Sequence, residues 1–319
     1  GQVGFFVMLL DSTRVALLAQ ASYAQPSLDR CVDRLLADCA ACASLRSARV
    51  LLKPNLITAR NGHLACTDSR LLTAAARWFI VQGARVQVGD SPSFGSARAV
   101  LEKLGALDGL TRLGAEVVEF RQGVVVDLPG GLQAPLAVPA LDCDLLVNLP
   151  RVKAHQQMRV TLAVKNYFGC VSGFHKPWCH MRHGGARPRF AELIIGLLAV
   201  LPDGLSLVDG VVAMHGSGPV HGEPHPLGLL ACATNPVAVD TALLAVLGVD
   251  PQQSPLWREA RRVGLPGTRL DELHFPEAAP ADLAVRDFVV PATLNPIRFN
   301  PFRFAKNSLR RLVLRLTGN

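Results

Sequence analysis

The sequence predicts an α/β fold in which a mostly parallel or mixed sheet is flanked by helices. Short apolar runs typical of strands alternate along the chain with segments whose apolar residues have helical spacing. Several of the apolar runs end in Asp, Asn, Gly or Pro, which terminate strands and begin turns. Half of the 319 residues are hydrophobic, which is enough for a large core.

The first half of the chain shows the strand and helix alternation most clearly. Strands are expected at residues 15–19, 49–53, 84–88 and 117–120, and helices at residues 28–45, 71–81, 97–104 and 107–113. Between residues 123 and 139 the apolar pieces shorten and are broken by a Pro-Gly-Gly turn, which predicts a small antiparallel excursion.

The second half repeats the pattern. Strands are expected at residues 145–147, 205–208 and 227–233, and helices at residues 190–201 and 236–247. Asn235 is suited to cap the last helix, because Pro236 then occupies the first helical position, where no hydrogen bond is lost. We expect residues 1–291 to form a single α/β domain, which could have two lobes.

Residues 292–319 differ from the rest, because arginines alternate there with phenylalanines and leucines. This pattern predicts a basic amphipathic tail. It favours a helix that contacts an anionic membrane surface or a partner, and a helix that covers the domain's own apolar surface is the alternative.

Charge and cysteine content narrow the classes of partner and compartment. The net charge of +8 favours acidic small molecules, anionic surfaces or nucleic acid. Nucleic acid is the weakest of these, because aromatic residues make up only 6% and no recognised motif accompanies the charge. No apolar run reaches the length of a spanning helix, and residues 1–10 lack the basic region of a signal peptide, so we expect a soluble, cytoplasmic protein.

The eight cysteines are too few and too irregularly spaced for a secreted disulfide scaffold, which predicts reduced thiols. Cys39 and Cys42 form a C-x-x-C, but with Cys31 they lie along the expected helix at residues 28–45. A reactive pair normally sits at a helix N-terminus, where the dipole lowers the thiol pKa. These cysteines are therefore predicted to pack in the core.

Polar side chains recur where the expected strands end, which indicates a shared site. If the strands are parallel, their carboxyl ends meet at one edge of the sheet. Lys53 and Asn55 follow one strand, and Asp90, Asn148 and Asp209 follow three others. Asn and Asp also terminate strands for purely structural reasons, but lysine is not a turn residue.

The segment 148–169 adds a dense set of polar residues to this edge. We expect the cations to bind an anionic small molecule and the amide, hydroxyl and carboxylate groups to orient it. The predicted substrate-binding residues are Lys53, Asn55, Asn148, Lys153, Thr161, Asn166 and Asp209. The predicted catalytic residues are His155, Asp90 and Lys165, because a histidine titrates near neutral pH and burial can tune an aspartate or a lysine.

Two further features can be explained either by a functional role or by ordinary structural requirements. Cys170, His180 and His183 are candidate ligands for a transition metal, although such histidines more often line a substrate loop or lie on a surface. Gly218, in the turn Gly-Ser-Gly-Pro, could let the backbone approach a bound substrate, but an ordinary tight turn is the commoner explanation.

Seven motifs in order resemble a known family. They are KPNL at 53–56, GDSP at 89–92, NLPRVKAH at 148–155, TLAVKNYFGCVSG at 161–173, VDG at 208–210, GSGPVHGEP at 216–224 and NPVAVD at 235–240. The chain resembles domain-of-unknown-function family 362, whose members are often fused to a ferredoxin-like segment with iron–sulfur clusters. The resemblance implies redox chemistry or electron transfer. It also implies an iron–sulfur cluster as the cofactor and a ferredoxin-like protein as a partner. This sequence has no C-x-x-C-x-x-C-x-x-x-C run to hold such a cluster.

Two functions remain. The first is a redox-linked enzyme that acts on an anionic small molecule in a crevice lined by lysine, histidine and aspartate. The second is a non-catalytic binding protein or partner subunit for an iron–sulfur protein. A pocket in which the lysines converge favours the enzyme, whereas lysines scattered over a convex face favour docking.

Overall fold

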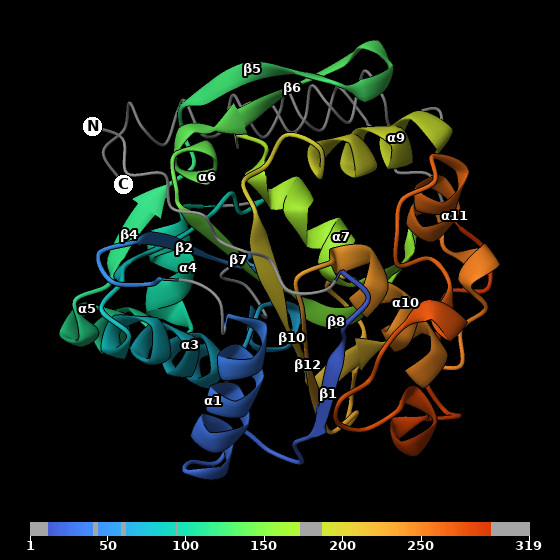
Figure 1. Ribbon diagram of the computed structural model, residues 1–319, viewed down its shortest axis with the longest axis horizontal. Coiled ribbons are helices and arrows are strands. Elements are labelled where there is room, and N and C mark those ends of the chain that lie inside the picture. The colour runs from blue at the N-terminus through green and yellow to red at the C-terminus, as the bar shows by residue number, and fades with distance from the viewer. Residues whose placement is uncertain (1–11, 41–43, 59–61, 94, 173–186, 295–319) are drawn as a thin grey trace.

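Ten strands form one mixed sheet that runs through the middle of the molecule, with helices on both faces (Figure 1). The computed structural model describes residues 12–40, 44–58, 62–93, 95–172 and 187–294. The strands of the main sheet are β1 (Ala16–Ala19), β2 (Arg49–Pro54), β3 (Arg85–Asp90), β4 (Glu116–Glu119), β7 (Leu145–Leu149), β8 (Arg151–His155), β9 (Arg159–Thr161), β10 (Gly204–His215), β11 (Glu223–His225) and β12 (Leu229–Ala233). A separate antiparallel hairpin consists of β5 (Gly123–Leu128) and β6 (Leu132–Ala137).

The order of the main path is β1-β12-β10-β7-β2-β3-β4. The five strands from β10 to β4 are parallel, so their carboxyl ends lie at one edge, while β12 is antiparallel to both of its neighbours. The long strand β10 pairs first with β7 and then with β8, and β9 pairs with β8 in a hairpin. Strand β8 therefore extends the sheet beyond the end of β7.

The helices lie in two groups, one on each face of the sheet (Figure 1). The longer ones are α1 (Ser27–Cys39), α3 (Ser69–Val81), α4 (Ala97–Lys103), α5 (Leu107–Leu113), α9 (Arg187–Leu197), α10 (Pro236–Val246) and α11 (Pro255–Arg262). The shorter ones are α2 (Gly62–Ala65), α6 (Val138–Leu141), α7 (Ala163–Asn166), η1 (Pro129–Gly131), η2 (Tyr167–Cys170), η3 (Pro251–Gln253), η4 (Leu270–Glu272) and η5 (Pro280–Leu283).

Alternation along the strands divides the core between the two faces. Val50 and Leu52 of β2 pack with α1, α3, α4 and α5, whereas Leu51 packs with α9 and the β5–β6 hairpin. Successive side chains of a strand point to opposite faces, which explains why this strand is apolar throughout. A third cluster joins α10 to β1 and β12.

The predicted fold class is confirmed, including the antiparallel excursion, which is the β5–β6 hairpin. The cap of α10 is also as predicted, because the Asn235 side chain accepts hydrogen bonds from the backbone N–H of Val237 and Ala238. The described cysteines of α1, Cys31 and Cys39, pack in the core; Cys42 lies outside the described residues. None of the helices in the described ranges is long and apolar enough to cross a lipid bilayer.

Two expectations were wrong in detail. Residues 151–155, expected as a polar segment after a strand, form the buried strand β8. Val160, Ala163 and Phe168 have helical spacing in the sequence, which predicts one helix, but Val160 lies in β9 and the following α7 has only four residues. The predicted tail at residues 292–319 falls almost wholly outside the described residues.

Candidate functional site

Lys53 and Asp90 form a buried ion pair at the carboxyl edge of the parallel strands. Strands β2 and β3 are parallel neighbours, so the ends that carry the two residues lie side by side. Lys53 Nζ lies 2.8 Å from Asp90 Oδ1 and donates a hydrogen bond of 2.9 Å to the Pro54 carbonyl. The other carboxylate oxygen of Asp90 accepts a hydrogen bond of 2.8 Å from the backbone N–H of Leu56.

Gly169 lies directly against this ion pair. A Cβ atom at position 169 would come 2.2 Å from Asp90 Oδ1 and 2.3 Å from Lys53 Nζ. Only a residue without a side chain lets the backbone of η2 approach the two charges so closely.

Lys153 is the second fully buried lysine of the site. Its Nζ donates hydrogen bonds to the side-chain oxygen of Asn55 and, at 2.6 Å, to the Ala65 carbonyl. No carboxylate of the described residues lies within ion-pair distance of this ammonium group. The pKa of Lys153 is lowered to about 7. Burial is the main cause; the charges of Arg151 and Lys165 act in the same direction, and those of Cys66 and Asp90 oppose it.

Three asparagines continue the hydrogen bonds away from Lys153. Asn55 Nδ2 donates to Asn166 Oδ1 at 2.7 Å, and Asn166 Nδ2 donates to Asn148 Oδ1 at 2.8 Å. Asn148 Nδ2 in turn donates to the Ala163 carbonyl at 3.0 Å and to Ser206 Oγ at 3.2 Å. Because each amide accepts on one side and donates on the other, the chain fixes the orientation of all three. We call Lys53, Asp90, Lys153 and these three asparagines the lysine cluster.

Lys165 lies beside the lysine cluster on the short helix α7. Its Nζ is 4.7 Å from the ring centroid of Phe168 and 5.5 Å from that of Phe190, and the side chain is half-buried. The N-terminus of α7 is fixed by Asp240, whose carboxylate accepts hydrogen bonds from the backbone N–H of Ala163 and Val164. Burial raises the pKa of Asp240 to about 8.

Asp209 belongs to a different group, which we call the arginine cluster (Arg151, Asp209, Tyr23 and the backbone of Asp68). Arg151 Nη1 lies 3.3 Å from Asp209 Oδ2, the Tyr23 hydroxyl donates to Asp209 Oδ1 at 2.5 Å, and the Asp68 N–H donates to Oδ2 at 2.9 Å. Arg151 also donates to the carbonyls of Val212 and Cys66. Burial raises the pKa of Asp209, and the positive charge of Arg151 opposes that rise.

The remaining predicted residues lie around the edge of the site. His155, at the end of β8, accepts hydrogen bonds at Nδ1 from the N–H of Gln157 and Met158, so its ring stabilises the turn before β9. Thr161 is buried and pairs with Lys153 in the β8–β9 ladder. A Cβ at Gly218 would come 2.0 Å from the Ala154 carbonyl, so this glycine allows the turn after β10 to contact β8.

Sequence reasoning missed four residues that build the site: Arg151, Tyr23, Gly169 and Asp240. Arg151, Gly169 and Asp240 lie inside the motifs that carried the resemblance. The alternation of polar and apolar residues in Arg-Val-Lys-Ala-His is the strand signal that could have identified β8. Tyr23 is distant in sequence, and no local pattern connects it to the site.

The part of the chain that the structure describes shows no ligand set for a metal or an iron–sulfur cluster. Cys170 is buried in η2, while His180 and His183 lie outside the described residues. The described cysteines are buried, and burial raises the pKa of Cys31 to about 11 and of Cys143 to about 12. Among the residues that the structure describes, no three His, Cys, Asp or Glu side chains are grouped as metal ligands would be.

Comparison with known families agrees with the motifs. The model of the domain of unknown function DUF362 matches residues 50–245, which include the ion pair, Lys153 and the asparagine chain. The chain belongs to this family. The DUF362 chain is also 38% identical over 269 residues to thylakoid-associated protein sll1697 of a Synechocystis strain, and the match covers 84% of each chain.

Two solved structures share part of the fold. The lactate racemase apoprotein from Thermoanaerobacterium thermosaccharolyticum is 14% identical, with a TM-score of 0.46 over 72% of this chain and 57% of that one. A protein from Thermotoga maritima, solved in a structural genomics programme, is 10% identical, with a TM-score of 0.42 over 65% and 55% of the two chains. This chain thus spans little more than half of each, and no argument about function rests on them.

Proposed function

We propose that the protein is an enzyme that binds an anionic small molecule at the lysine cluster and uses Lys153 to transfer a proton. The proposal rests on an excess of buried positive charge over buried negative charge at this site. Lys53 and Lys153 are both fully buried, yet the described residues give them one carboxylate, Asp90, within ion-pair distance. An anion bound beside Lys153 and Lys165 would supply the missing negative charge.

The partly exposed members of the site indicate where the ligand would enter. Asn55, Lys165 and Gly169 are half-buried, while Lys53, Asp90 and Lys153 lie deeper. Asn55 hydrogen-bonds to Lys153, so a ligand that displaces its side-chain oxygen would contact the ammonium group directly.

Lys153 is suited to proton transfer because a group is most effective when its pKa lies near the working pH. Burial lowers the pKa of Lys153 to about 7, so neutral and charged forms coexist at neutral pH. In this proposal Lys153 accepts or donates the proton, Lys165 binds the anion and Asn166 orients it.

Burial also favours this proposal over the second candidate, a non-catalytic partner subunit that docks through its lysines. Side chains that are inaccessible to solvent cannot form a flat docking surface without a rearrangement. A redox step, which the family resemblance implies, enters the proposal only through an external electron carrier such as a ferredoxin-like protein. No part of the proposed function runs through a cluster held by this chain's described cysteines.

Calorimetry with small anions tests the proposal. Inorganic phosphate, oxalate and malonate are titrated into the wild type, into Lys165→Gln and into Lys103→Gln, whose lysine is exposed on α4. We expect at least one anion to bind the wild type, about tenfold weaker binding to Lys165→Gln, and unchanged binding to Lys103→Gln. Equal binding to all three proteins, or none at millimolar concentration, contradicts the proposal.

We also propose that the protein associates peripherally with an anionic membrane surface through residues 292–319. The support is the dense arginine and phenylalanine pattern of this segment and the name of the thylakoid-associated relative. Co-sedimentation with phosphatidylglycerol vesicles should fall strongly when the segment is deleted. Equal sedimentation of both proteins argues against this role.

A further inference from the structure

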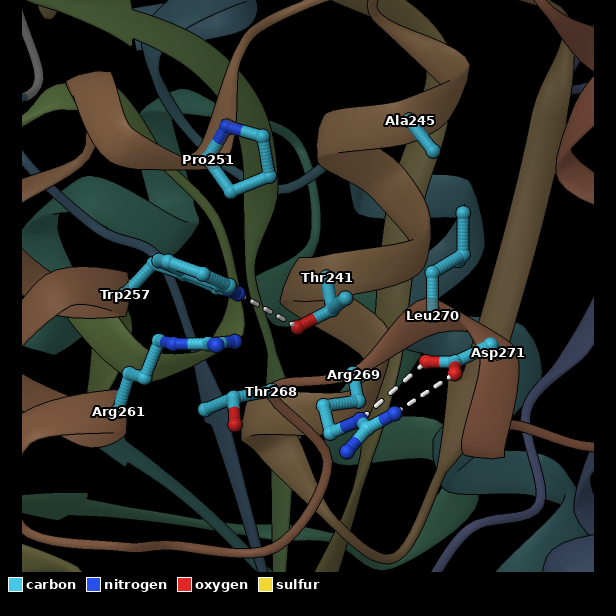
Figure 2. A pocket seen from close by; sticks show the side chains of 9 residues that line it. All are labelled: Thr241, Ala245, Pro251, Trp257, Arg261, Thr268, Arg269, Leu270 and Asp271. Carbon is cyan, nitrogen blue, oxygen red and sulfur yellow. Dashed lines mark hydrogen bonds and ion pairs between the residues drawn. The ribbon is translucent and has the colours of Figure 1, made fainter.

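A pocket with no role in the lysine cluster lies between α10, α11 and the segment 268–271 (Figure 2). Its volume is about 540 Å³, within the range of small-molecule sites. It is lined by Thr241, Ala245, Pro251, Trp257, Arg261, Thr268, Arg269, Leu270 and Asp271.

Trp257 forms a rigid part of the pocket wall. Only 8% of this residue is exposed, and its indole N–H donates a hydrogen bond of 3.1 Å to Thr241 Oγ1. The Thr241 hydroxyl donates in turn to the Val237 carbonyl of the same helix at 2.9 Å. The indole ring is therefore held in one orientation before any ligand arrives.

Arg261 is the polar group that this ring holds in place. Its guanidinium carbon lies 5.4 Å from the Trp257 ring centroid, which is within cation–π distance. Within the ranges that the structure describes, the Arg261 side chain makes no hydrogen bond or ion pair, so its donors are available to a ligand. A planar guanidinium stacked on an aromatic ring is well prepared to bind a carboxylate with two parallel hydrogen bonds.

The second arginine of the pocket, Arg269, is already paired with carboxylates. Arg269 lies 2.9 Å from Asp271 and 3.0 Å from Glu272. The hydrogen bond from Arg269 lowers the pKa of Asp271, which therefore stays ionised. Because Arg261 is the arginine of the pocket without a carboxylate partner among the described residues, and Asp271 and Glu272 repel a second negative charge, the pocket favours a monocarboxylate over a dicarboxylate.

The wall opposite Arg261 contains the apolar side chains of Ala245 and Leu270, with Asp271 beside Leu270. Figure 2 shows Arg261 and Thr268 on one side of the pocket and Ala245 and Leu270 on the other, with Pro251 at the end. We propose that this pocket binds a small amphipathic monocarboxylate. The carboxylate pairs with Arg261, and the apolar body lies against Ala245, Pro251 and Leu270.

Calorimetry of the full chain with 4-phenylbutyrate tests this site. The neutral analogue 4-phenylbutyramide has the same apolar body without the charge, so we expect it to bind at least about tenfold more weakly. Arg261→Gln should weaken 4-phenylbutyrate binding by about tenfold or more. Arg258→Gln, which changes an exposed arginine of the same helix outside the pocket, should leave binding unchanged.

Three results would overturn the site: no binding of 4-phenylbutyrate at millimolar concentration, equal binding to wild type and Arg261→Gln, or equal binding of the acid and its amide. Binding that survives in Arg261→Gln but is lost in Lys165→Gln assigns the carboxylate to the lysine cluster, and this also overturns the pocket. The proposed function fails on a different result, the absence of Lys165-dependent anion binding.

Discussion

The arginine cluster and the lysine cluster lie side by side but balance their buried charge differently. Arg151 and Lys153 are alternate residues of β8, so their side chains lie on the same face of the strand, and both donate to backbone carbonyls in the segment 65–66. Arg151 has a carboxylate partner in Asp209, and both oxygens of that carboxylate accept further hydrogen bonds. Among the described residues, the partners of Lys153 are an amide oxygen and a backbone carbonyl.

This difference separates a structural group from a functional one. A buried charge with all partners in place stabilises one arrangement of the chain and leaves nothing for a ligand to do. A buried cation that lacks a counter-ion is held in a costly state that a bound anion would relieve. The comparison leads to four predictions about stability.

The largest expected effect is the loss of Asp209. Asp209→Asn leaves Arg151 buried without a counter-ion and should lower the free energy of unfolding by about 3–5 kcal/mol in urea denaturation at pH 7. Asp127→Asn, at an exposed carboxylate of β5, should change it by less than about 0.5 kcal/mol. If the two variants are equally stable, the arginine cluster does not have the structural role described.

Removing Lys153 should have a smaller effect, with a defined dependence on pH. The pKa of Lys153 is lowered to about 7 from the ordinary 10.5, so between these values the unfolded chain binds a proton that the folded protein has released. The wild type therefore becomes more stable as pH rises through this window, by about 1.4 kcal/mol per pH unit. Below pH 7 the lysine is charged in both the folded and the unfolded protein, and the full cost of burying that charge remains.

Lys153→Met abolishes this contribution. Relative to the wild type, the variant should be most stable near pH 7 and should lose that advantage as pH rises to 9. Urea denaturation of both proteins at pH 7, 8 and 9 measures the trend. A stability difference that stays constant over these pH values contradicts the lowered pKa.

Gly169→Ala tests the contact that covers the ion pair. The new methyl group would overlap Lys53 and Asp90, so we expect a loss of about 1–3 kcal/mol together with weaker anion binding. Gly109→Ala is the matched control, because a Cβ at this helical position meets nothing closer than 3.7 Å. It should be neutral or stabilising by up to about 1 kcal/mol. If Gly169→Ala is as stable as Gly109→Ala, the backbone at position 169 does not pack closely against the ion pair.

The smallest effect on stability is expected for Lys165→Met. This side chain is half-buried and lies against Phe168 and Phe190, so its loss should change the free energy of unfolding by less than about 1 kcal/mol. Anion binding should nevertheless fall, as measured by calorimetry. A large loss of stability with unchanged binding would reassign Lys165 to a structural role.

The sequence predicted those parts of the site that depend on parallel strands. Lys53, Asp90 and Asn148 follow three apolar runs, and parallel pairing of β2, β3 and β7 brings them to one edge. This convergence follows from topology alone, because the ends of neighbouring parallel strands are only about 5 Å apart.

The parts that were not predictable depend on contacts between distant segments. Asp209 follows an apolar run in the same way as Asp90, but β10 continues past it to His215. Its partner is Arg151, which the sequence presented as part of a polar segment. The charged residues of β8 are buried because the segment at residues 63–66 covers them, and no local pattern encodes that cover. The positions of the polar residues in the sequence therefore do not show which belong to the arginine cluster and which to the lysine cluster.

The most direct test of the central claim is an NMR titration of the Lys153 side chain, with and without a bound anion. In the free protein we expect a pKa near 7, and anion binding should raise it because the ligand supplies the missing negative charge. A pKa near the ordinary 10.5 in the free protein, or no change when an anion binds, would contradict the claim that Lys153 is an uncompensated cation awaiting a ligand.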